Sequence, residues 1–191
     1  MRNQTKTIWL WVLRIVLTLA CIAVLAFILS NSLKEAEESA AQSSAVVEVI
    51  QEVASVIAPD SEIANATGDA YERLHALVRN VAHVSEFALL GALTIWCYFS
   101  YTQEKLFLAI PLCSLLIVPV LDEYLQLHVG GRASTLQDLF LDTAGCAIGV
   151  AFALLTLLIG GWIVAAERKK KEKKVRVDEF GLEIPEGYPN A

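Results

Sequence analysis

The sequence contains none of the short motifs by which many soluble enzymes are identified. It has no C-x-x-C spacing, no nucleophile elbow and no glycine-rich phosphate loop, so no motif supports acyl or phosphoryl transfer by those routes. Its cysteines all fall inside apolar runs, with no histidine nearby. We therefore interpret them as small packing residues. They are Cys21, Cys97, Cys113 and Cys146.

Charge is scarce wherever the chain is apolar. The 191 residues are 55% hydrophobic, and the apolar residues gather in long runs, which favours an integral membrane protein of one domain. The net charge of −6 conceals a segregation of charge along the chain. Residues 31–79 carry nine acidic and three basic side chains, whereas residues 168–176 carry seven basic and one acidic.

Four apolar runs are long enough to cross a bilayer as helices. The first, 8–29, has 22 residues and so roughly 33 Å of helix. Asp69 with Glu72 three residues later predicts a capping box for the helix that contains the second run. Ser134 or Thr135 can cap the fourth helix. The predicted fold is all-α, a polytopic membrane protein with transmembrane helices over 8–29, 81–100, 106–127 and 137–164.

The acidic segment between the first two spans contains a short amphipathic helix. Apolar side chains recur at helical spacing over 46–57, and Pro59 closes the pattern. We interpret this helix as lying on the membrane or capping the bundle, and a partner-binding helix is the alternative.

Loop charges predict the orientation. The basic residues Arg2 and Lys6 and the cluster at 168–176 place both termini in the cytoplasm, and four spans agree with this. The predicted segments are 1–29, the first transmembrane helix; 30–74, an extracellular acidic segment; 75–164, a core of three transmembrane helices; and 165–191, a cytoplasmic basic tail, expected to be poorly ordered.

Three of the predicted spans carry ionisable residues at similar depth. Glu86 lies roughly 8 Å below the outer boundary of the second span, and Asp122 and Glu123 lie about 6–8 Å from the outer end of the third. Helical spacing places Arg79, His83 and Glu86 on one face. We also expect Glu123 to pair with Gln126, three residues later. The predicted polar site comprises Arg79, His83, Glu86, Asp122, Glu123, Gln126, Arg132, Asp138 and Asp142.

Acids outnumber bases in this layer. Two arginines face five carboxyl groups, and such an excess is relieved by carboxyl protonation, by water, by a bound cation or by a cationic ligand. No cofactor is established, but His83 with Glu86 and a neighbouring Asp could ligate a divalent cation or pass protons. The alternative is a network of ion pairs that only sets helix register. Taken alone, Asp122 also fits a residue facing water at a helix end.

Gly145 and Gly149 are spaced so that another helix can approach the fourth span closely. The pair also offers a contact for a homo-oligomer.

These residues and spacings resemble the VanZ-like family of small bacterial membrane proteins. The chain departs from the family pattern at Asn80, where a basic residue is usual, and at Asp142, where Asn is usual. The resemblance covers roughly residues 75–150 and depends on Arg79-Asn80-Val81-Ala82-His83, Glu86-Phe87, Leu90-Gly91, Asp122-Glu123-Tyr124-Leu125-Gln126, Gly131-Arg132, Asp138 and the Gly145/Gly149 pair.

The resemblance implies a multi-pass protein of the bacterial cytoplasmic membrane. The family's namesake is associated with low-level resistance to teicoplanin-type glycopeptides, so a role in the cell envelope is expected. Two alternatives stay open, a membrane enzyme acting on an envelope lipid headgroup and a small proton-coupled transporter, and with them the question of whether the protein is an enzyme. The expected partners are the lipid bilayer and an envelope lipid or cationic amphiphile, with no nucleic acid.

Overall fold

The structure is a computed structural model that describes residues 2–102, 104, 106–131 and 135–175. The regular secondary structure of these residues is entirely helical: α1 (Arg2–Ser32), α2 (Ala36–Ile57), α3 (Asp69–Tyr101), the short 3₁₀ helix η1 (Leu106–Leu108), α4 (Ala109–Gln126) and α5 (Leu136–Val175). The predicted all-α fold is confirmed. Four of the helices are long and apolar enough to cross a membrane, over Thr7–Ser32, Asp69–Tyr101, Ala109–Gln126 and Leu136–Lys170.

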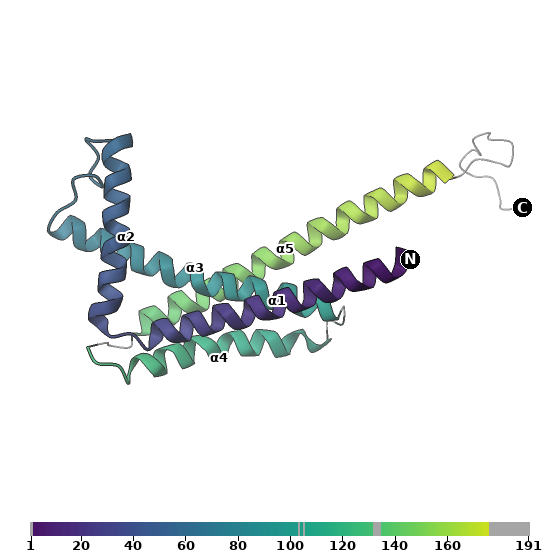
Figure 1. Ribbon diagram of the computed structural model, residues 1–191, viewed down its shortest axis with the longest axis horizontal. Helices are drawn as coiled ribbons and strands as arrows, with labels where there is room; N and C mark the ends of the chain where they lie inside the picture. Colours follow the sequence, from purple (N-terminus) through teal and green to yellow (C-terminus); the bar gives the residue numbers. More distant parts are fainter. Residues whose placement is uncertain (1, 103, 105, 132–134, 176–191) are drawn as a thin grey trace, which may run out of the picture. The chain divides into compact units, whose positions relative to one another are not determined.

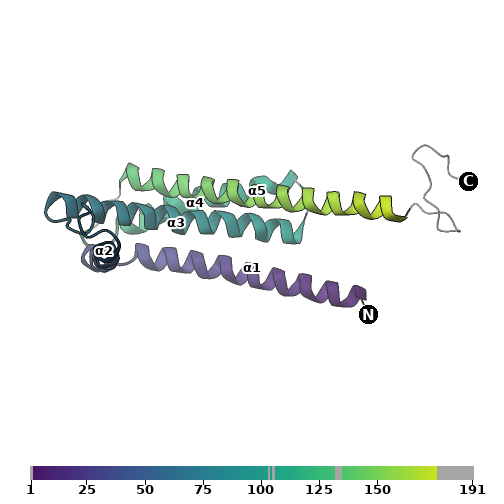
Figure 2. The same ribbon diagram turned by 90° about the horizontal axis from the view of Figure 1, so that it is seen from above.

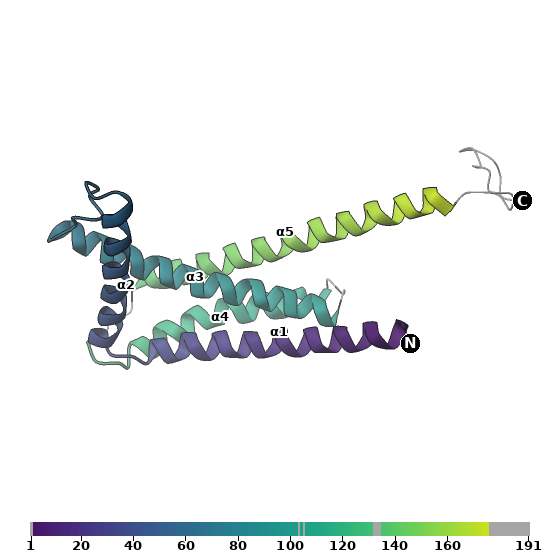
Figure 3. The same ribbon diagram turned by 45° about the horizontal axis from the view of Figure 1, so that its top comes forward.

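The chain forms two compact units, Met1–Ala153 and Leu154–Ala191. In the first unit α1, α3 and α4 lie alongside one another and alternate in direction (Figures 1 and 3). The first part of α5 begins at the end where α4 finishes. α2 packs on α3 and lies across this end of the helices, so that Figure 2 looks along its axis. The predicted polar residues Arg79, His83, Glu86, Asp122 and Gln126 lie at this end, where they and residues of α2 line one cavity.

Several predicted boundaries need correction. α2 is longer than the expected 46–57, because the residues from Ala36 onward contain no breaker and favour a helix. α3 begins after Gly68 without a side-chain cap, so the capping box predicted at Asp69 is wrong. Gly68 has a φ of 53°, a conformation that glycine adopts at little cost.

The C-terminal tail also differs from expectation. α5 continues through the basic cluster to Val175, so the chain is not irregular from residue 165. Lys, Arg and Glu are good helix formers, and no proline or glycine interrupts the run. The remainder of the tail lies outside the described residues.

The prolines and the cap of α5 follow simple rules. Pro111 lies in the first turn of α4, where its missing N–H removes no helical bond, and Pro119 lies in the interior. Thr135 caps α5, since its Oγ1 accepts a hydrogen bond of 3.1 Å from the backbone N of Asp138.

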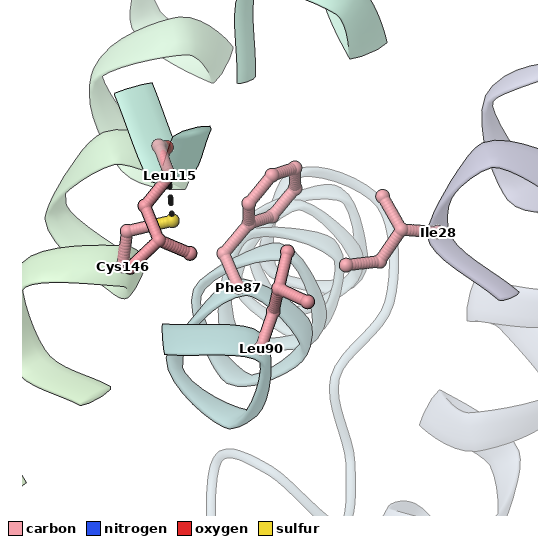
Figure 4. Close-up of a cluster of buried hydrophobic side chains, with 5 residues drawn as sticks. All are labelled: Ile28, Phe87, Leu90, Leu115 and Cys146. Carbon is pink, nitrogen blue, oxygen red and sulfur yellow. Dashed lines mark hydrogen bonds between the residues drawn. The ribbon is translucent and has the colours of Figure 1, made fainter. Parts of the chain in front are cut away.

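The buried core of the first unit lies next to the polar residues. Its cluster takes one side chain each from α1, α4 and α5 and two from α3 (Figure 4). Cys146 donates to the carbonyl of Leu115 over 3.6 Å, as expected of a packing cysteine. The members are Ile28, Phe87, Leu90, Leu115 and Cys146.

Glycines allow α3 and α5 to pack closely. A Cβ at Gly145 would lie 2.7 Å from the backbone oxygen of Val84, and one at Gly149 would overlap the carbonyl of Ala88. Both positions are therefore occupied by α3 of the same chain, as the small-residue spacing predicted. A homo-oligomer would need a different face.

The apolar stripe of α2 is mostly open. Val47 is fully buried, whereas Val49 and Val53 are more than half exposed. α2 thus buries Val47 against the bundle, whereas Val49 and Val53 are available to lipid or another surface.

Candidate functional site

A cavity of about 210 Å³ opens between α1, α2, α3 and α4 at the end that α2 crosses. α3 contributes three ionisable side chains to its wall. Because Arg79, His83 and Glu86 are spaced by four and three residues, they share one helix face, and all three line the cavity. Asp122 and Gln126 line it from α4.

His83 contacts the first half of α5 behind the cavity. Its Nδ1 lies 3.0 Å from Oδ1 of Asp142, whose side chain is fully buried. The close packing of α3 on Gly145 and Gly149, one and two turns further along α5, brings this pair together. Oδ2 of Asp142 is buried and has no hydrogen-bond partner in the described part of the chain.

Asp122 is buried rather than exposed to water. Only 2% of the residue is exposed, because the end of α1 covers it. Ser32 Oγ donates a hydrogen bond to Oδ1 of Asp122, and Gln126 Nε2 donates one of 2.6 Å to Oδ2. The reading of Asp122 as a solvated helix end is therefore wrong, and Gln126 pairs with Asp122 rather than with Glu123.

Glu123 of α4 and Asp138 of α5 both lie at the start of α5. Oε2 of Glu123 accepts a hydrogen bond of 3.2 Å from the backbone N of Thr135. Asp138, in the first turn of α5, forms an ion pair of 2.8 Å with Arg79, where the helix dipole also favours an anion. The Asp138 side chain is 6% exposed and the Arg79 side chain 43% exposed, so part of the Arg79 side chain remains accessible.

Glu86 points toward α1. Its Oε1 accepts a hydrogen bond of 3.3 Å from Asn31 Nδ2. The donor atoms that lie within 4.8 Å of one another are those of His83, Asp122 and Asp142, so Glu86 does not take the place in a metal-ligand group that the sequence suggested. Arg132 lies outside the described residues.

Sequence reasoning missed the contribution of α1. Asn31 and Ser32 hold Glu86 and Asp122, yet the first span was predicted to end at residue 29. The signal was present as Ser30-Asn31-Ser32, a polar triplet directly after an apolar run. Such a triplet at the depth of buried acids is a candidate source of hydrogen-bond donors.

The arrangement gathers buried acids around one imidazole. Asp122 and Asp142 come from different helices, and each carboxylate loses its hydration when buried. His83 and the donors on α1 and α4 compensate part of this cost. The group can therefore accept a positive charge, whether from a proton, a cation or a cationic ligand.

Comparison with known proteins identifies the family. A family model described as VanZ/LLP1 matches residues 16–159, which includes most of α1, all of α2 to α4 and the part of α5 that carries Asp138 and Asp142. No curated protein and no solved structure matches the chain. The match covers most of the sequence, and with the four membrane-spanning helices it establishes that this chain is a membrane protein of the VanZ/LLP1 family.

Proposed function

We propose that this protein acts in the bacterial cell envelope and lowers susceptibility to teicoplanin-type glycopeptides through its polar cavity. The observation that carries the proposal is the acid-lined cavity, with Glu86 and Asp122 in its wall. It lies beneath α2, whose first turn carries Glu37 and Glu38. A cationic amphiphile at the outer surface would be attracted to such a region. The family's namesake supports the choice of ligand.

The proposal requires the α2 end to face outward. Arg2 and Lys6 begin α1 at the opposite end, and Lys/Arg-rich ends stay in the cytoplasm. Both termini are then cytoplasmic, and the segment between α1 and α3 is extracellular.

Expression in a susceptible Gram-positive host tests the role. Wild-type protein should raise the minimum inhibitory concentration of teicoplanin, and Glu86→Gln and Asp122→Asn should remove that increase. Asp60→Asn, which changes an exposed acid away from the cavity, is the control and should behave as wild type. If wild-type protein is present in the membrane and susceptibility does not change, the proposal is wrong.

A second candidate is an enzyme that acts on an envelope lipid headgroup. The observation that favours it is the partly exposed side chain of Arg79 in the same cavity as His83. Arginine binds phosphate well, and an imidazole can serve as general acid or base. Lipid analysis of cells with wild-type protein, Arg79→Ala, Glu86→Gln or Glu123→Gln tests it. A change in one lipid that the variants lose supports an enzyme, and unchanged polyprenyl and phospholipid pools exclude it.

A proton-coupled transporter is less well supported. Four spans without an internal repeat would need a second copy to form two halves. The glycine pair that could have joined two copies is already packed against α3.

A further inference from the structure

Three helices each contribute one metal-binding side chain to a single point of the bundle. His83 comes from α3, Asp122 from α4 and Asp142 from α5. One donor atom of each lies within 4.8 Å of the others. The imidazole is 16% exposed, and both aspartates are almost completely buried. Residues so far apart in sequence meet here only because the fold brings them together.

The hydrogen bonds of the two aspartates are unequal. Asp122 accepts hydrogen bonds on both oxygens, from Ser32 and Gln126. Asp142 accepts one from His83, and its Oδ2 has no partner in the described part of the chain although it is buried. A buried carboxylate oxygen without a donor costs free energy. A cation bound through Oδ2 would satisfy that oxygen.

The balance of charge at this point also favours a bound cation. When both are ionised, the carboxylates of Asp122 and Asp142 carry two negative charges, which one divalent cation neutralises. Arg79 is already paired with Asp138 and does not supply that charge. His83 and Asp122 line the cavity, so an ion can reach them from the cavity, with Asp142 behind them.

We propose that His83, Asp122 and Asp142 bind one divalent transition-metal ion, Zn²⁺ or Mn²⁺. One imidazole nitrogen with two carboxylate oxygens is a donor set that suits these ions better than Ca²⁺ or Mg²⁺, which prefer oxygen alone. Three protein ligands leave a further position open toward the cavity. Ser32 and Gln126 orient the Asp122 carboxylate, as outer-shell partners do in metal sites.

This site goes beyond the proposed role in glycopeptide susceptibility and is tested separately from it. Metal binding is measured on purified protein, whereas susceptibility is measured by growth. A negative growth experiment leaves the metal site standing, and a failure to bind metal leaves the growth phenotype to be explained by the cavity alone.

The test is calorimetric titration of the full chain, purified in detergent and treated with chelator, with ZnCl₂ and MnCl₂. We expect one ion per chain, with MgCl₂ and CaCl₂ binding much more weakly. Gln126→Ala should weaken binding by about 10- to 100-fold, and His83→Gln and Asp142→Asn should weaken it further. Glu86→Gln is the comparison variant, because it removes an acid from the same cavity but not from the ligand group, and it should lose far less affinity than Asp142→Asn.

Thermal unfolding guards against misfolded variants. With chelator present, Asp142→Asn should unfold at or above the wild-type temperature, because it removes one of two neighbouring buried charges. Added ZnCl₂ should raise the unfolding temperature of wild type and Glu86→Gln but not of Asp142→Asn. The proposal is overturned if wild type binds no ion, if Asp142→Asn binds as well as wild type, or if Glu86→Gln loses binding to the same extent.

Discussion

Substituting alanine for Gly149 tests the contact on which the site depends. At this position a Cβ would overlap the backbone carbonyl of Ala88. Two other glycines, Gly145 on α5 and Gly91 on α3, also lie close to the backbone of the opposite helix. A Cβ at Gly145 would lie 2.7 Å from Val84 O, and one at Gly91 would lie 2.5 Å from Cys146 O, where ordinary contact begins at 3.4 Å. Backbone atoms cannot rotate away, so α3 and α5 would have to separate.

The expected magnitude follows from the overlap. Adding a methyl group to a well-packed interior costs about 1–3 kcal/mol. Gly145→Ala, about 0.7 Å short of ordinary contact, should fall within that range, and Gly149→Ala should lie at its upper end or above. The same separation would lengthen the 3.0 Å contact between His83 and Asp142. Gly149→Ala should therefore lose site function as well as stability.

Unfolding by increasing mole fraction of SDS in mixed micelles measures the free energy of each variant. Gly130→Ala is the control, because no described atom lies within 4 Å of a Cβ placed there, and it should change stability by less than about 0.5 kcal/mol. If Gly149→Ala were as stable as Gly130→Ala, close packing of α3 on α5 would be refuted. The geometry of the His83–Asp142 pair would then have no support.

Two further predictions concern α2 and the orientation. Val47→Ala should lower the free energy of unfolding by about 1.6 kcal/mol, because about 0.8 kcal/mol is lost for each of two buried methylene equivalents. Val49→Ala is the control and should be near neutral, because Val49 is 59% exposed. Equal losses in the two variants would show that α2 is not anchored through Val47. In a cysteine-free background, a membrane-impermeant maleimide should label Asp60→Cys on intact cells and Lys169→Cys only after lysis. The reverse result would invert the topology.

Much of the helical architecture could be predicted from local features of the chain. Run length and hydropathy located all four spans, because a bilayer admits only segments that satisfy their own backbone and are long enough to cross it. Boundaries were less predictable. The start of α3 just after Gly68 and the continuation of α5 to Val175 depend on small propensity differences that no span length constrains.

Partners within the polar layer were harder to predict. Periodicity placed Arg79, His83 and Glu86 on one face, and they do line one cavity. It could not show that Glu86 turns toward Asn31 of α1 while His83 turns toward Asp142 of α5. Helical spacing specifies which residues share a face of one helix but not which neighbouring helix that face meets.

By itself the sequence determined the membrane class, the four spans, the family pattern and the glycine pair that admits a close neighbour. These are properties of single segments, decided by hydropathy, length and residue size. Only the tertiary structure decided that α3 is that neighbour, that the end of α1 buries Asp122, and that Asp122, Asp142 and His83 meet at one point. The physical reason is that the rotation of each helix about its axis is set by packing against the others. That rotation selects which acids are buried together.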